Sequence, residues 1–408
     1  MIKKEMLNHL TDVIIPFWKG LRDELNGGYL GYVGYDLKVD EKAGKGCILN
    51  SRILWFFANA YTLNKSLATY NNLDMEIEVD EALLEHATHA YNFMRENFLD
   101  NKYGGLFWST LANGVPDDTT KHTYNQAFAI YALASYYEAA GDEEALQLAL
   151  ELFTLIETKC VDNIGYKEAF DEQFLEISNE KLSENSIIAN RTMNTLLHLI
   201  EAYTELYRVA TAIDARKRKE IQFKLELMLS TVAEKIYNPE LRRQEVFFDN
   251  EMNSIIDLHS YGHDIEAAWL IDRAVEVMGN RSYFIRMTPI TANLTDEIYK
   301  VAYNGHSLAY ESERAEVNES RVWWVQAEAV TGFYHAYKRE PKREEYLEAA
   351  VQIWEFIKEY MIDSRPDSEW FSEVDKDGYP DTSLPMADPW KCPYHNGRMC
   401  FEIIKMEV

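Results

Sequence analysis

The feature that most constrains the fold is a helical periodicity of apolar residues that recurs along nearly the whole chain. In residues 80–99, DEALLEHATHAYNFMRENFL, apolar side chains return at i, i+3 and i+4, which is the pattern of an amphipathic helix. The same pattern appears in eleven further stretches, at about 4–24, 50–64, 122–140, 143–158, 190–210, 215–236, 263–279, 282–303, 320–338, 343–362 and 394–405. Extended patterns are short and scattered, so the sequence predicts an all-α fold of twelve helices.

The connectors between these helices are of two alternating kinds. Gly- or aromatic-rich segments such as Gly27-Gly28-Tyr29 follow the odd-numbered helices, and short turns such as Ala140-Gly141-Asp142 follow several even-numbered ones. Six helical hairpins bury their apolar faces most completely when they close into a ring. We therefore expect residues 1–408 to form a single (α/α)6-barrel domain of six helical hairpins. An open solenoid is disfavoured because both chain ends carry apolar, aromatic helices, and polar residues 64–80 are expected to form a surface loop.

The charge balance narrows the range of partners. The net charge is −27, from 41 basic and 68 acidic residues. Because such a surface repels phosphate backbones and anionic lipids, we expect no nucleic-acid or membrane partner and a neutral small-molecule substrate. No stretch reaches the roughly 20 apolar residues of a membrane helix, and the N-terminus lacks the apolar run of a signal peptide.

Cysteine and aromatic content add two weaker indications. Cys47, Cys160, Cys392 and Cys400 have neither the density of a disulfide scaffold nor the spacing of a zinc site, so we expect a cytoplasmic protein. We also expect a monomer. The 9 Trp, 26 Tyr and 18 Phe residues suit a cleft that stacks on sugar rings, although they also fill cores.

Polar residues of unusual type gather at the starts of the even-numbered helices. These are Asn50-Ser51-Arg52, His122-Thr123-Tyr124-Asn125, Asn194 with His198 one turn later, Gly262-His263-Asp264-Ile265-Glu266, the run from Arg321 through Trp323 and Trp324 to Glu328, and the run from Pro393 through His395 to Arg398. If the even-numbered helices form the inner ring, their first turns converge at one mouth of the barrel. The alternation therefore predicts a single site there.

Two interpretations of the histidines near residue 263 are open. His263 and Glu266 stand at i and i+3, so the carboxylate is expected to accept a hydrogen bond that fixes the tautomer of the imidazole and raises its basicity. His259, His263 and Glu266 also have the spacing of some metal sites. Gly262 stands where the helix is expected to start, which makes a common face doubtful, so we predict no metal.

Each singled-out residue also has a purely structural interpretation. His263 and Glu266 fit a surface pair, His395 a satisfied buried histidine, Trp323, Trp324 and Trp390 core residues, Arg52 a plain ion-paired residue, and Glu328 a buried partner of Arg52 or Arg321.

At these motifs the sequence resembles the N-acylglucosamine 2-epimerase superfamily. The stretches that carry the resemblance are NSRILWFFANAY (50–61), KHTYNQAFAIYAL (121–133), MNTLLHLIEAYTELY (193–207), DLHSYGHDIEAAWL (257–270), RVWWVQAEAVTGF (321–333) and PWKCPYHNGRMC (389–400). They span essentially the whole chain, and the weaker parts are 64–80 and 280–318.

The resemblance implies an (α/α)6 barrel that inverts C2 of the reducing-end sugar of a β-1,4-linked disaccharide, such as cellobiose or lactose, without a cofactor. Carried over by motif, the residues fall into three groups. His263 and His395 are the acid/base pair; Arg52, His198, Asn194 and Glu266 support them; and Tyr124, Trp323, Trp324, Glu328, Trp390 and Arg398 are substrate-binding candidates.

The chemistry needs an acid and a base at two stages. Ring opening requires both around O1 and O5, and removal of the C2 proton then gives an enediolate that Arg52 and helix N-termini can stabilise. Inversion requires a proton on the opposite face of C2. Two histidines can serve the two faces, or one base can serve after the intermediate rotates, and the sequence leaves both routes open.

Four other functions compete with this reading. A glycoside hydrolase on the same barrel would use paired carboxylates, whereas these helix starts are richer in histidine. A non-catalytic sugar-binding protein would exchange no C2 hydrogen. An aldose–ketose isomerase would reprotonate the same enediolate at C1. Epimerases of mannose or of N-acylated sugars would differ mainly in pocket size and in recognition of the 2-substituent.

Overall fold

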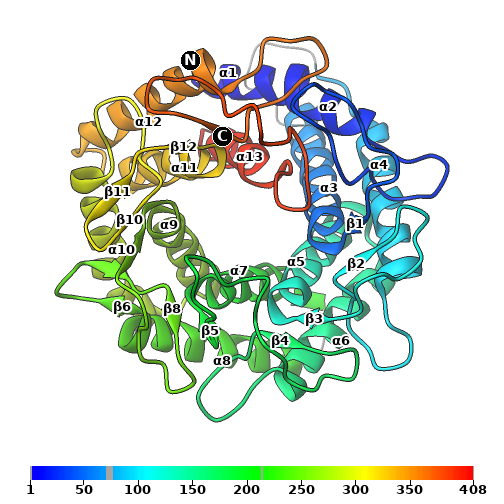
Figure 1. The fold of residues 1–408 in the computed structure, drawn as a ribbon. Helices are drawn as coiled ribbons and strands as arrows, with labels where there is room; N and C mark the ends of the chain where they lie inside the picture. Colours follow the sequence, from blue (N-terminus) through cyan, green and yellow to red (C-terminus); the bar gives the residue numbers. More distant parts are fainter. Residues whose placement is uncertain (1, 70–76, 213–214, 408) are drawn as a thin grey trace.

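The computed structural model describes residues 2–69, 77–212 and 215–407, and the helices in these ranges form two concentric rings (Figure 1). The inner ring consists of α3 (Cys47–Thr69), α5 (Thr123–Ala140), α7 (Met193–Val209), α9 (Tyr261–Met278), α11 (Trp323–Arg339) and α13 (Tyr394–Met406). The outer ring consists of α1 (Ile2–His9) with α2 (Ile15–Gly20), α4 (Glu81–Phe93), α6 (Glu143–Lys159), α8 (Ala215–Thr231), α10 (Arg281–Val301) and α12 (Glu344–Phe356).

Each inner helix packs against the next, and α13 packs back onto α3, which closes the ring. The predicted (α/α)6 barrel is thereby confirmed, and the alternative of an open solenoid is excluded. The inner helices carry apolar residues on nearly every side because they face both the barrel interior and the outer ring. In α5, for example, every residue from Thr123 to Tyr136 is buried.

Short antiparallel strands connect neighbouring hairpins where the inner helices begin. Each of these pairs joins the residues just before one inner helix to the connector that leads to the next. The pairs are β1 (Lys45–Gly46) with β2 (Ser109–Thr110), β3 (Lys121–His122) with β4 (Ala169–Phe170), β5 (Arg191–Thr192) with β8 (Phe247–Phe248), β9 (Leu258–Ser260) with β10 (Glu311–Glu313), and β12 (Arg321–Val322) with β13 (Glu373–Val374). A bridge between Val33 and Ala387 joins the first connector to the last. The loops around this mouth are therefore fixed to one another.

The remaining elements are local. β11 (Glu316–Asn318) extends the β9–β10 pair, and β6 (Tyr237–Asn238) pairs with β7 (Arg243–Gln244). Four outer-ring segments contain a π-helical turn, at Leu10–Ile14, Met94–Phe98, Val232–Ile236 and Ile357–Met361, and Ala210–Ala212 form a 3-10 turn.

Buried or half-buried ion pairs hold the connectors against the inner helices in the first three repeats. Lys121, just before α5, donates to Asp100 at 2.6 Å, and Asp100 also accepts from the backbone of Lys102 and Tyr103. The pairs of Lys45 with Asp23, at 2.7 Å, and of Arg191 with Asp162, at 2.6 Å, repeat this arrangement. A connector clamped in this way positions the first turn of the helix that follows it.

Helix α3 is longer than the periodicity predicted. It continues to Thr69 because Leu67 packs into the core, so the expected loop over 64–80 is helical at its start, and residues 70–76 lie outside the described residues. Among the described helices, none combines the length and the apolar composition that crossing a bilayer requires.

Candidate functional site

A cavity of about 340 Å³ opens at the mouth where the inner helices begin. Ten of the twelve candidate residues line it, namely Arg52, Tyr124, Asn194, His198, His263, Glu266, Trp323, Trp324, Trp390 and His395. Glu328 and Arg398 do not line the cavity; they lie buried behind it, in contact with His395 and Glu266. The first turns of the inner helices therefore converge on one cavity, as the alternation of the motifs predicted.

Gly262 allows two of the inner helices to approach closely at this mouth. A Cβ atom at Gly262 would lie 2.5 Å from the indole of Trp324, so only glycine leaves room for that ring. The indole of Trp324 consequently lies against both catalytic candidates, with ring centroids 4.7 Å from His263 and 5.5 Å from His395. One aromatic side chain therefore holds the two imidazoles in the same part of the cavity.

His395 is held by a carboxylate behind the cavity. Its Nδ1 atom lies 2.7 Å from Oε1 of Glu328, whose other oxygen accepts from Nε1 of Trp269 at 3.0 Å. Because a carboxylate only accepts hydrogen bonds, the proton of His395 is on Nδ1 and the lone pair is on Nε2. Burial, with the charges of Arg398 and Arg52 nearby, lowers the pKa of His395 well below its usual value. The imidazole is neutral at physiological pH and can accept a proton.

His198 is oriented in the same way by a residue that the sequence analysis did not single out. Its Nδ1 atom donates to Glu201 at 2.9 Å, and Glu201 also accepts from the hydroxyl of Tyr394 at 2.6 Å. Although burial opposes ionisation, Arg398 and His198 lower the pKa of Glu201 to about 2. Glu201 is therefore charged and holds both His198 and Arg398.

Arg398 is the centre of this buried network. Its guanidinium bonds Glu201 at 2.5 Å and Glu328 at 2.6 Å, and it also contacts Glu266. Burial and the neighbouring Glu328 raise the pKa of Glu266 to about 8. Burial also raises the pKa of Glu328, but Glu328 accepts from Arg398, Trp269 and His395, whereas Oε2 of Glu266 has no partner among the described residues. Glu266 is thus the member of the pair that holds a proton.

The predicted hydrogen bond between His263 and Glu266 is not formed. Glu266 turns to Arg398, and Nδ1 of His263 lies 2.7 Å from the hydroxyl of Ser260. Burial and the nearby His198 lower the pKa of His263 to about 3. His263 is therefore neutral, and the hydroxyl of Ser260 can either donate a hydrogen bond to Nδ1 of His263 or accept one from it.

Arg52 presents a positive charge to the cavity. It donates to the hydroxyl of Tyr124 at 2.9 Å and to the carbonyl oxygen of Trp390 at 3.4 Å, and it lies over the ring of Phe128 at 4.2 Å. Within the described part of the chain, no carboxylate pairs with Arg52. The proposed pairing with Glu328 is not formed. The guanidinium is available to a negative oxygen in the cavity.

The arrangement of possible metal ligands differs from the one considered from the sequence. His259 bonds Asp264 at 2.9 Å, so His259, His263 and Glu266 do not form a ligand set. Ligand atoms of Glu266, Glu328 and His395 do lie within 4.8 Å of one another. The guanidinium of Arg398 contacts both carboxyl groups and occupies the position that a cation would take. These residues fit an acid/base network built around an arginine.

Three functional neighbours were not predicted: Glu201, Ser260 and Trp269. Glu201 had a usable signal, since His198 and Glu201 have the same i, i+3 spacing as His263 and Glu266. Ser260 and Trp269 carry no such signal because serine and tryptophan beside a helix start fit many structural roles.

Comparison with known proteins agrees with this geometry. The model of the N-acylglucosamine 2-epimerase (GlcNAc 2-epimerase) family matches residues 28–396. The chain is 48% identical over 408 residues to a cellobiose 2-epimerase of Ruminococcus albus, and the match covers 100% of both chains. A crystal structure of a sugar epimerase from a ruminal bacterium superposes with a TM-score of 0.93 at 46% identity over 100% of both chains. A cellobiose 2-epimerase from Bacillus thermoamylovorans superposes with a TM-score of 0.91 at 43% identity, over 100% of this chain and 99% of the other.

Proposed function

The chain belongs to the N-acylglucosamine 2-epimerase family, and we propose that it is an isomerase that inverts C2 of the reducing-end glucose of β-1,4-linked disaccharides. The substrate is cellobiose, which becomes 4-O-β-D-glucosyl-D-mannose, and lactose is converted to epilactose in the same way. The observation that carries the proposal is the cavity in which neutral His263 and His395 both contact the indole of Trp324. The guanidinium of Arg52, which has no carboxylate partner among the described residues, lines the same cavity. The cysteine pattern supports a cytoplasmic location, and we propose that the protein acts as a monomer.

Ring opening begins the reaction in this proposal. The proton of the O1 hydroxyl passes to His263 as O1 forms the carbonyl with C1, the C1–O5 bond breaks, and the protonated carboxyl of Glu266 gives its proton to O5. Both groups line the cavity, and the raised pKa of Glu266, about 8, keeps its proton in place at neutral pH. The open-chain aldehyde then has an acidic C2–H bond next to its carbonyl group.

Inversion at C2 follows. Nε2 of His395 takes the C2 proton, and Glu328 stabilises the imidazolium that forms. The negative charge moves to oxygen, where Arg52 stabilises the enediolate. The imidazolium of His263 then delivers its proton to the opposite face of C2. Ring closure returns a proton from O5 to Glu266 and one from His395 to O1, which restores the starting state.

The competing reactions fit the site less well. A glycoside hydrolase needs one carboxyl group as the acid and another as the base or nucleophile. Here the two innermost carboxyl groups, Glu266 and Glu328, both contact Arg398, so they form part of one buried network. Aldose–ketose conversion requires only that the same enediolate be protonated at C1, so it is the closest alternative.

Product analysis tests the proposal. Incubation with cellobiose is expected to give a disaccharide with a mannose reducing end, identified by its anomeric NMR signals. Free glucose would indicate a hydrolase, a ketose an isomerase, and unchanged cellobiose a binding protein. The matched control is methyl β-cellobioside, whose reducing end cannot open; it must stay unchanged if ring opening is the first step.

A further inference from the structure

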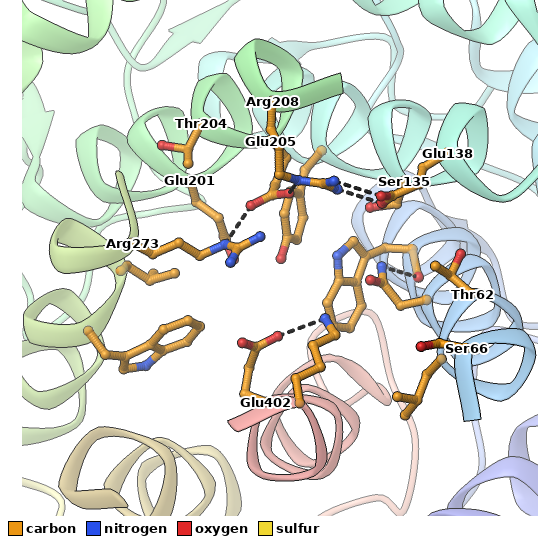
Figure 2. Close-up of a pocket in the computed structure, with 17 residues that line it drawn as sticks. Thr62, Ser66, Ser135, Glu138, Glu201, Thr204, Glu205, Arg208, Arg273 and Glu402 are labelled. Carbon is orange, nitrogen blue, oxygen red and sulfur yellow. Dashed lines mark hydrogen bonds and ion pairs between the residues drawn. The ribbon is translucent and has the colours of Figure 1, made fainter. Parts of the chain in front are cut away.

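A second chamber lies at the other end of the barrel, between the C-terminal halves of five inner helices (Figure 2). Its volume is about 270 Å³, and none of its lining residues lines the catalytic cavity. We call it the rear chamber. Its lining includes Trp55, Tyr131, Ser135, Glu201, Trp269 and Arg273.

Several polar groups in the rear chamber have no protein partner. Within residues 2–69, 77–212 and 215–407, no hydrogen bond is formed by Nε1 of Trp55 or by the hydroxyls of Tyr131 and Ser135, although these side chains belong to residues only 3%, 7% and 5% exposed. Arg273 bonds Glu205 through Nε alone, at 2.6 Å, so its two terminal nitrogens are also without a protein partner. Buried polar groups are nearly always hydrogen-bonded. These three buried residues, together with Arg273, whose side chain is 33% exposed, therefore present unpaired hydrogen-bonding groups to a polar occupant of the chamber.

The walls indicate what kind of occupant fits. Trp55 and Tyr131 stack on each other with ring centroids 5.4 Å apart, and the indole of Trp269 forms another part of the lining. Aromatic faces beside neutral hydrogen-bond donors are suited to a molecule that is apolar on its C–H faces and polar on its edges.

The charged groups of the lining are already paired. Arg208 bonds Glu138 at 2.5 Å, Arg273 bonds Glu205 at 2.6 Å, and Lys405 bonds Glu402 at 2.9 Å (Figure 2). Glu201, the remaining charged group of the lining, bonds Arg398. Because four carboxylates and only three cationic groups line the chamber, an anionic occupant would be repelled. A cationic occupant would gain little binding energy, because each carboxylate already has its counter-ion. A neutral occupant is favoured.

We propose that the rear chamber is a second binding site, separate from the catalytic cavity, for a neutral polyhydroxyl molecule about the size of a monosaccharide. The site also touches the catalytic network. Trp269 lines the chamber and donates to Glu328, which holds His395, and Glu201 lines it and holds His198. An occupant therefore packs against Glu201, which orients His198, and against Trp269, which bonds the carboxylate that orients His395, and it alters the rate of the reaction.

D-Sorbitol is the probe, because it is a polyol of this size with no reducing end to convert. Its binding to the protein is measured by saturation-transfer NMR. Ser135→Leu removes a hydroxyl and fills part of the rear chamber, and Trp55→Phe removes the indole N–H group and reduces the aromatic face; each is expected to weaken sorbitol binding roughly tenfold. Trp390→Ala, in the catalytic cavity, is the matched control and leaves sorbitol binding unchanged. Thermal unfolding establishes that each variant is folded.

The outcomes separate the two sites. Binding that weakens in Ser135→Leu and Trp55→Phe but persists in Trp390→Ala supports the rear chamber. Absence of sorbitol binding to the unaltered protein, or binding that is lost in Trp390→Ala and kept in Ser135→Leu, overturns the proposal. Binding is read without turnover, so these results stand whether or not cellobiose is the substrate. Sorbitol should also change the rate of turnover in the unaltered protein but not in Ser135→Leu; equal responses would refute the coupling.

Discussion

The Nδ1 atom of His395 donates a hydrogen bond to Glu328 across 2.7 Å, and this contact decides which nitrogen of the imidazole can act as a base. His198 and Glu201 repeat the arrangement at 2.9 Å. In both pairs the carboxylate also forms an ion pair with Arg398. The reactive face of the site thus depends on a buried layer that does not touch the cavity itself.

Replacement of Glu328 by glutamine tests this dependence. The amide keeps the shape but removes the charge that stabilises the imidazolium of His395, so we expect kcat to fall about 100-fold with little change in KM. Steady-state kinetics with cellobiose measure the effect. Glu373→Gln is the matched control, because Glu373 lines the same cavity but forms no hydrogen bond with His395. Similar losses in the two variants would contradict the role of Glu328.

The pH dependence of kcat/KM is expected to be unusual for a histidine enzyme. Burial lowers the pKa of His263 to about 3 and that of His395 well below its usual value, so neither is protonated as the pH falls through 6.5. Glu266, with a pKa raised to about 8, loses its proton as the pH rises. We predict a flat profile from about pH 5.5 to 7.5 and a decline above about pH 8. An acidic limb centred near 6.5 would disagree with this assignment.

Buried histidines outside the site make the fold sensitive to acid. Burial lowers the pKa of His9 to about 3, and its Nε2 atom accepts a hydrogen bond from Trp370 at 2.7 Å. A group whose pKa is lower in the folded state stabilises the fold above its unfolded pKa of 6.5, and this contribution is lost as the pH falls toward 3. Each such histidine reduces the free energy of unfolding by about 1.4 kcal/mol per pH unit in that range.

His9→Gln keeps the acceptor for Trp370 and cannot be protonated, so its stability should fall less steeply. Urea unfolding at pH 7, 6 and 5 measures the two slopes. Parallel slopes for the variant and the unaltered protein would show that His9 is not a neutral buried group.

The clamp between Lys121 and Asp100 is expected to matter for folding. Both side chains are buried, with exposures of 0% and 4%. Lys121→Met leaves Asp100 as an unpaired buried charge and should lower the free energy of unfolding by about 3–5 kcal/mol. Adding Asp100→Asn removes that charge and should recover part of the loss, as measured by denaturant unfolding. A single variant within about 1 kcal/mol of the unaltered protein would mean that the clamp adds little.

The ring of helices is readable from the sequence because helical periodicity and connector type are local properties. The same applies to the gathering of Arg52, Tyr124, His198, His263 and His395, since each lies near the start of an inner helix. The end of α3 was missed because Leu67 is held by tertiary packing that its polar neighbours do not indicate.

The pairing of the site residues was not readable. His263 with Glu266 and His198 with Glu201 satisfy the same spacing, and only the second pair forms. Arg398, which comes from the last helix, bonds both Glu201 and Glu266, but only Glu201 also reaches its histidine, and His263 contacts Ser260 instead. The rear chamber could not be predicted either, because it forms only when five inner helices bring side chains such as Trp55 and Ser135 together in the assembled barrel.

The central claim is that two histidines serve opposite faces of C2, and isotope content at early conversion tests it most directly. Cellobiose is incubated in heavy water, and deuterium at C2 is measured by NMR in both the epimer and the remaining cellobiose. Two monoprotic bases predict an epimer fully labelled at C2 while the remaining cellobiose stays unlabelled. An epimer that retains the original C2 proton, or equal labelling of both sugars, would contradict the claim and indicate a single base.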